Sequence, residues 1–224
     1  MRYIFCLIFL TLTSCQSLWP SVTTMPSVNL MPEEIFIDSV SIGRKRENRI
    51  DILKYKTSDS VYVVINFYSK SNSKWKLLNK YKFEKDYLSG IDPVITDFNG
   101  DGLNDVTYVS DVAARGSNEI RRLFIYRRES HDLMLVKNSE LYPNMLYNKE
   151  LKCIDALLLH GGCTTVFLKL VNDSLKATAS VELSDSVYVK TYDEGGREKS
   201  KVVRAAGDDE FIRYKNFNPL EEYQ

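Results

Sequence analysis

Short runs in which apolar and more polar residues alternate recur along this chain of 224 residues, with clusters of turn-forming residues between them. In residues 61–68, Val61, Val63, Ile65 and Phe67 alternate with side chains of mixed polarity. A period of two places these four residues on one face of a strand. Further hairpin candidates are centred on residues 69–73, 172–173, 184–186 and 195–196. Consecutive hairpins predict antiparallel sheet.

Helical patterning is weak, because no 12-residue stretch carries an apolar stripe at helical spacing. We expect a helical turn only at residues 84–89 and in the tail after Asp208. Three weakly similar stretches begin near Ile50, Asp105 and Leu157, at a spacing of roughly 50 residues that is typical of propeller blades. The sequence therefore predicts an all-β fold, with antiparallel hairpins in a small or irregular β-propeller-like body. A β-sandwich is the alternative.

The first 15 residues have the pattern of a secretory signal peptide. Arg2 precedes an apolar run over residues 3–12, which is too short to span a bilayer as a stable helix. The run ends in Leu-Thr-Ser-Cys15, which resembles the lipobox of bacterial lipoproteins. That resemblance implies that Cys15 is lipidated and becomes the mature N-terminus, and acyl chains such as palmitate would then hold the protein on a membrane. An ordinary cleaved signal with an incidental Cys15 is the alternative.

The next segment, residues 16–32, contains three prolines and no charged residue, and we expect it to be a flexible tether. No acidic residue directly follows Cys15, so neither an inner-membrane retention signal nor an acidic surface-export signal is seen. The sequence predicts a lipid anchor in the cell envelope, on the outer membrane and facing the periplasm. Residues 33–224 are predicted to form a single all-β domain.

The charge balance argues against one class of partner. Lys plus Arg number 30 and Asp plus Glu also number 30, so the chain has no excess positive charge with which to attract nucleic acid. Arg121-Arg122 and Arg127-Arg128 flank a predicted strand and suggest a basic patch, although solvated strand ends are the usual explanation of such pairs.

The most specific motif is a nine-residue loop between two apolar runs, in which Asp97, Asn99, Asp101 and Asp105 occupy positions 1, 3, 5 and 9. Ca²⁺ prefers six to eight oxygen ligands, and a tightly wound loop presents them from alternate positions. The backbone carbonyl oxygen of Leu103 is the predicted ligand at position 7. These five residues are the predicted calcium ligands, and Ca²⁺ is the predicted cofactor.

Gly102 falls at the sixth position, where the chain must turn sharply and a Cβ would be in the way. The motif resembles the calcium loops of FG-GAP and VCBS-type repeats, in which the loop joins two strands of a propeller blade. It differs from an EF-hand, whose twelfth position is a glutamate where this chain has Tyr108. An Asx-rich turn that caps the backbone without a metal is the alternative.

Beyond the loop, the order of elements over roughly residues 90–185 resembles a group of bacterial lipoproteins. Some members are calcium-dependent periplasmic immunity proteins that inhibit lysozyme-like peptidoglycan hydrolases. The resemblance implies calcium ligation by the residues named above and assigns no inhibitory residue.

Two cysteines remain for the body, because Cys6 leaves with the signal peptide and Cys15 is lipidated. Cys153 and Cys163 form a possible disulfide, since the predicted compartment permits disulfides. A tight turn at residues 161–162 would instead leave the two cysteines out of register. The sequence leaves both outcomes open.

No acid–base pair or nucleophile motif stands out, so no catalytic residue is assigned and the chain is not predicted to be an enzyme. The sequence predicts a membrane-anchored, calcium-binding envelope lipoprotein that binds a protein partner. The resemblance supplies a lysozyme-like peptidoglycan hydrolase, inhibited by the protein, as the candidate partner. The alternative is a glycan-binding or adhesion lipoprotein of the cell surface.

Overall fold

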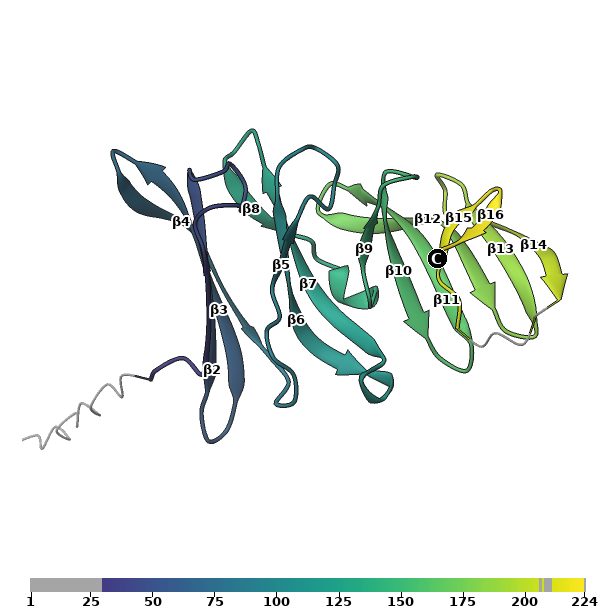
Figure 1. Cartoon of the computed structure of the whole chain (residues 1–224), viewed down its shortest axis with the longest axis horizontal. Helices are drawn as coiled ribbons and strands as arrows, with labels where there is room; N and C mark the ends of the chain where they lie inside the picture. Colours follow the sequence, from purple (N-terminus) through teal and green to yellow (C-terminus); the bar gives the residue numbers. More distant parts are fainter. Residues whose placement is uncertain (1–29, 206, 208–210, 224) are drawn as a thin grey trace, which may run out of the picture. The chain divides into compact units, whose positions relative to one another are not determined.

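Consecutive antiparallel strands form the part of the chain that the structure, a computed structural model, describes: residues 30–205, 207 and 211–223 (Figure 1). Met31–Gln224 makes up one compact unit. The predicted signal peptide at 1–15, with Cys15, and most of the predicted tether at 16–32 lie outside the described residues.

Three sheets follow one another along the chain, and in each of them neighbouring strands in sequence are neighbours in the sheet. The first, four-stranded sheet contains β1 (Glu34–Asp38), β2 (Asn48–Lys56), β3 (Val61–Ser71) and β4 (Lys74–Glu84). The middle, four-stranded sheet contains β5 (Val94–Thr96), β6 (Asp105–Ala113), β7 (Asn118–Arg127) and β8 (Asp132–Leu135). The third, six-stranded sheet contains β9 (Leu146–Asn148), β10 (Cys153–Leu159), β11 (Cys163–Val171), β12 (Ser174–Leu183), β13 (Ser186–Tyr192) and β14 (Glu198–Ala205). A hairpin of β15 (Tyr214–Phe217) and β16 (Leu220–Glu222) completes the described strands.

This architecture confirms the predicted all-β fold of antiparallel hairpins. The similar stretches that begin near Ile50, Asp105 and Leu157 fall in β2, β6 and β10, which are the second strands of the three successive sheets. Each of these sheets therefore starts with a short edge strand and continues as a meander, which is how the strands of a propeller blade are connected.

The predicted helical turns are wrong in position. Residues 85–89 are loop, and the described tail is the β15–β16 hairpin. The helical turns of the described chain are instead two short 3-10 turns, η1 (Ala114–Gly116) and η2 (Ser139–Leu141). Within residues 30–205, 207 and 211–223, no helix has the length and hydrophobicity needed to span a membrane.

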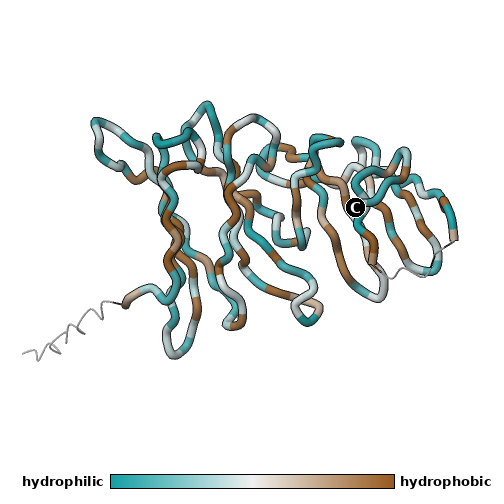
Figure 2. The backbone as a smooth tube through the Cα atoms, in the orientation of Figure 1, coloured by the Kyte–Doolittle hydropathy of each residue, from teal (hydrophilic) through white to brown (hydrophobic). Residues whose placement is uncertain are grey.

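The middle sheet buries both of its faces. Along β7, Phe124 and Tyr126 belong to a core shared with the first sheet, whereas Leu123 and Ile125 belong to a core shared with the third sheet. All four side chains are at most 3% exposed. A strand that is covered on both sides needs apolar residues at every position, which explains why this run does not alternate. Figure 2 shows hydrophobic residues concentrated along the strands and hydrophilic residues in many of the turns.

A third core lies between the other face of the third sheet and the C-terminal hairpin, where Phe167 and Tyr214 are fully buried. Cys153 and Cys163 belong to this core, and both are free thiols. Cys163 pairs with Leu159 in the β10–β11 register, so Cys153 lies six positions further along its strand. At about 3.3 Å per residue this offset is roughly 20 Å, which far exceeds the Cα separation of a disulfide. The possible disulfide is therefore not formed.

Substitutions on β7 test the two-faced burial of the middle sheet. We expect Leu123→Ala and Phe124→Ala each to lower the free energy of unfolding by about 3 kcal/mol or more, because each deletes a fully buried side chain from a different core. Val202→Ala, on the exposed strand β14, is the control and should change it by less than about 1 kcal/mol. Urea unfolding measures all three values, and a small effect at either β7 position would contradict the arrangement.

Candidate metal site

The predicted calcium loop connects β5 to β6 and is attached to two different cores. Phe98, at the second position of the loop, is 3% exposed and packs in the core between the middle and third sheets. Leu103, at the seventh position, packs against the core between the first and middle sheets. Because the two apolar residues lie on opposite sides of the middle sheet, the polar residues between them are held at its edge.

Asp105 ends the loop and begins β6. Its carboxylate is fully buried, and its two oxygens accept hydrogen bonds at 2.8 Å from the backbone amides of Phe98 and Tyr126. Burial raises the pKa of the Asp105 carboxyl to about 7, and the nearby carboxylates of Asp101 and Asp97 add to the increase. A cation beside this group would favour its charged form.

The other candidate ligands are bonded to the loop's own backbone. The oxygens of Asp97 accept hydrogen bonds from the amides of Gly100 at 2.6 Å and Gly102 at 2.8 Å. Asn99 accepts one from the amide two residues further on at 3.0 Å, and Asp101 does the same at 2.8 Å. These contacts are those of an Asx-rich turn. They hold the backbone of residues 97–103 in a tightly wound conformation.

The side chains of the loop do not converge on a single point. Nowhere in the part of the chain that the structure describes do three or more His, Cys, Asp or Glu side chains converge closely enough to hold a metal. The donor set nevertheless suits Ca²⁺ in type, because it combines three carboxylates, one amide oxygen and one carbonyl. Oδ2 of Asp97 accepts one amide, that of Gly102, and keeps a second lone pair for an ion, whereas Oδ1 accepts three. Asp97 and Asp101 would have to turn slightly from their amide partners to bind it.

Two glycines allow the winding, for different reasons. Gly100 has φ +77° and Gly102 has φ +83°, a backbone conformation that other residues rarely adopt. A Cβ on Gly102 would have no atom within 4 Å, so the predicted steric reason for this glycine is wrong and the conformational one remains. A Cβ on Gly100, by contrast, would collide with the hydroxyl of Tyr147 on β9.

Contacts from outside also hold the loop. The Asn104 side chain donates to the carbonyl of Ser41 at 3.0 Å, and the amide of Gly43 donates to the Asn104 carbonyl at 2.9 Å. On the other side, the guanidinium of Arg128 donates to the carbonyl of Asp101 at 3.2 Å. The loop is therefore bonded both to the turn before β2 and to the end of β7.

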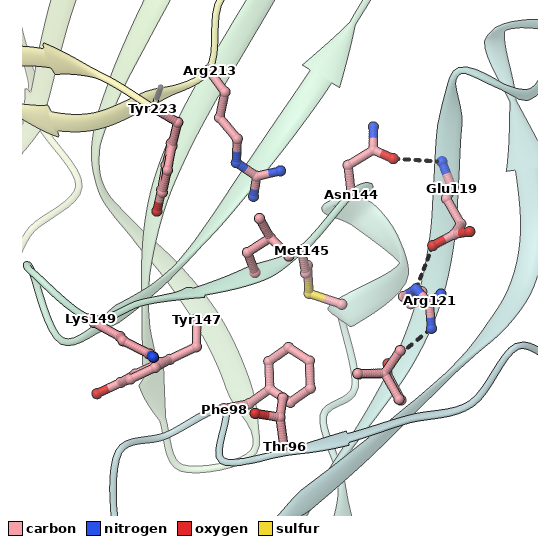
Figure 3. Close-up of a pocket in the computed structure, with 13 residues that line it drawn as sticks. Thr96, Phe98, Glu119, Arg121, Asn144, Met145, Tyr147, Lys149, Arg213 and Tyr223 are labelled. Atoms are coloured by element: carbon pink, nitrogen blue, oxygen red, sulfur yellow. Dashed lines mark hydrogen bonds and ion pairs between the residues drawn. The ribbon is translucent and has the colours of Figure 1, made fainter.

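A cavity of about 480 Å³ lies beside the loop, between the middle and third sheets (Figure 3). Phe98 of the loop and Met145 form its apolar part, and Tyr147 lies at its lower side in the view. The loop and the cavity share Phe98 directly, and Tyr147 touches both. An ion that orders the loop would also restrict Tyr147, the part of this wall that lies against Gly100.

Charged residues line the same cavity. The guanidinium of Arg121 forms an ion pair with Glu119 at 2.5 Å and donates to the carbonyl of Asp92 at 2.8 Å. Arg121 is only 9% exposed, so the explanation of this arginine as a solvated strand end is wrong. Sequence reasoning did not find the cavity, because residues such as Glu119 and Arg213 are far apart in the chain and form no motif.

Alanine substitutions of the two glycines test the loop geometry. We expect Gly102→Ala to lower the free energy of unfolding by about 1–2 kcal/mol, the cost of a left-handed backbone for a residue with Cβ. Gly100→Ala should cost somewhat more, because the methyl group must also displace the hydroxyl end of the Tyr147 side chain. Thermal or urea unfolding measures both.

Gly116→Ala is the matched control outside the loop, with φ +91° and open space around the site. Its cost should equal that of Gly102→Ala. Equal costs for all three variants would mean that Tyr147 does not restrict Gly100.

Comparisons with known proteins add little to this geometry. No family model matches the chain, and no curated protein matches it. One similar solved structure is entitled "Structure of a Xanthomonas Type IV Secretion System related protein". It is 11% identical, the alignment covers 87% of this chain and 98% of that one, and the TM-score is 0.41. At this identity and TM-score, no property of that protein extends to this chain.

Proposed function

We propose that this protein is a lipid-anchored envelope lipoprotein whose β body, stiffened by one calcium ion, binds a protein partner. The partner class that we propose is a lysozyme-like peptidoglycan hydrolase, which the protein inhibits. The anchor is Cys15, and the proposed location is the periplasmic face of the outer membrane.

The observation that carries this proposal is the set of oxygen ligands on the loop between β5 and β6. Asp97, Asn99, Asp101 and Asp105 occupy positions 1, 3, 5 and 9 of the loop. The carboxylate of Asp105 is buried, and the carboxylates of Asp101 and Asp97 are near enough to raise its pKa further, so a cation at the loop would favour its charged form. A bound Ca²⁺ supplies the missing positive charge and fixes the ends of the loop relative to each other.

Calcium would affect partner binding by making the loop and the adjoining cavity wall more rigid. The loop is attached to two cores and forms a wall of the adjoining cavity through Phe98. The core already holds Phe98, so the residues that an ion would order are those that follow it in the loop, together with Tyr147 beside Gly100. Ordering them before the partner arrives removes part of the entropy cost of association. Removal of the ion should therefore weaken partner binding even where the partner does not touch the loop.

Glycan binding, the alternative function, would need exposed aromatic faces on which sugar rings could pack. On the outer face of the first sheet, the ring of Tyr62 stacks on that of Tyr55 with centroids 5.2 Å apart. The ammonium of Lys82 lies 3.9 Å from the Tyr62 centroid. Neighbouring side chains already occupy this ring, whereas Tyr87 and Phe211 are 53% and 58% exposed, so glycan binding is the second candidate function.

Affinity capture from envelope extract tests the proposal directly. The purified protein should retain a partner in Ca²⁺, and excess EGTA should reduce the retained amount at least tenfold. Asp101→Asn should have the same effect as EGTA, because it removes a ligand charge. Asp59→Asn, which changes an exposed aspartate outside the loop, is the matched control and should bind like the unmodified protein.

The identity of the partner is tested by activity. The captured protein should be a peptidoglycan hydrolase, and its cleavage of purified peptidoglycan should fall when the lipoprotein and Ca²⁺ are added. Retention that is unchanged by both EGTA and Asp101→Asn would contradict the role of calcium. A captured partner without hydrolase activity would contradict the proposed partner class.

A further inference from the structure

The cavity beside the loop opens between two short edge strands. β5 pairs with β6 and β9 pairs with β10, so each presents an outer backbone edge that has no strand partner within the described residues. Two apolar residues on these strands line the cavity and are well exposed: Val94 is 41% and Leu146 is 49% exposed. An open strand edge with an apolar side chain beside it is a surface to which an extended chain can bind.

The inner part of the cavity combines apolar and cationic groups. Figure 3 shows the ring of Phe98 and the side chain of Met145 on one side of the guanidinium of Arg213. Phe98 and Met145 are 3% and 4% exposed, so these side chains are fixed by the core behind them. The cavity is therefore preformed for an apolar group with polar contacts nearby.

The carboxylate of Asp155 holds the guanidinium of Arg213 in place. Its Nε donates to a carboxylate oxygen of Asp155 at 2.7 Å, and a terminal nitrogen bonds to the same residue. The hydroxyl of Tyr223 donates to the other oxygen of Asp155 at 2.6 Å. The second terminal nitrogen of Arg213 has no hydrogen-bond partner among the residues that the structure describes. This nitrogen is available to a ligand.

The charges around the cavity do not balance. Arg121 is paired with Glu119 and Arg213 with Asp155, whereas Lys149 forms no ion pair within the described part of the chain. Lys149 is an exposed residue of the cavity lining, and its ammonium is a positive charge that no carboxylate of the described residues pairs with. A single negative group on the ligand would neutralise it.

We propose that this cavity is the docking site for an extended segment of the protein partner, with one apolar side chain against Phe98 and Met145 and an adjacent carboxylate near Lys149. This inference deepens the proposed function and rests on it, since it names the surface that takes the partner. The chain's own segment 16–32 is a poorer occupant, because it carries no charged residue.

A small probe tests the site without the partner. N-acetyl-leucine carries an apolar side chain and a carboxylate, and N-acetyl-leucinamide is the same molecule without the charge. With the protein in Ca²⁺, we expect N-acetyl-leucine to shift the methyl NMR signal of Met145 with a millimolar Kd, as suits a ligand of this size. The amide should bind at least threefold more weakly.

Lys149→Glu should weaken binding of N-acetyl-leucine about threefold to tenfold and leave binding of the amide nearly unchanged. Lys176→Glu changes another exposed lysine, which does not line the cavity; it is the matched control and should have no effect. Both are surface substitutions that should not disturb folding.

Several outcomes would overturn the inference. Equal binding of N-acetyl-leucine and its amide would mean that the carboxylate does not contribute to binding. The absence of a shift at Met145 would mean that the cavity is not the docking site. A stronger response to N-acetylglucosamine than to N-acetyl-leucine would indicate a sugar site instead.

The partner capture described above separates this inference from the proposed function. If a partner is captured by the unmodified protein and by Lys149→Glu equally, the docking site is wrong and the function stands. If no partner is captured at all, the function fails whatever the probe does.

Discussion

The hydrogen bonds from the amides of Phe98 and Tyr126 to the carboxylate of Asp105 are the contacts on which the site depends. They join the start of the loop, its last residue and strand β7 at one buried point. Such a group costs free energy to bury unless it is fully hydrogen-bonded or balanced by a cation. The middle sheet makes the burial possible, because cores cover both of its faces.

The loop and the cavity are consequences of the same packing. Phe98 enters the core on one side of the middle sheet and Leu103 packs on the other, so the polar residues between them are confined to the sheet edge. The same edge, with Tyr147 of the third sheet against Gly100, forms part of the cavity wall. An ion at the loop would therefore act on the cavity through side chains that touch both, with no need for a larger rearrangement.

Local patterns predicted what depends on local structure. Alternation in residues 61–68 identified β3, and the similar stretches near Ile50, Asp105 and Leu157 marked the second strand of each of three sheets. The cavity was not predictable, because it joins Glu119, Met145 and Arg213 through the stacking of sheets, which leaves no periodicity in the sequence. The tail was wrongly given a helical turn because its strands are short and irregular, with a register shift between Tyr214 and Asn216.

Calorimetric titration of Ca²⁺ into the chelator-treated, purified protein tests the central claim most directly, together with thermal melting in Ca²⁺ and in EGTA. The account predicts heat of binding for one ion per chain and a higher melting temperature in Ca²⁺. The absence of both effects would mean that the loop at residues 97–105 is an Asx-rich turn that binds no metal.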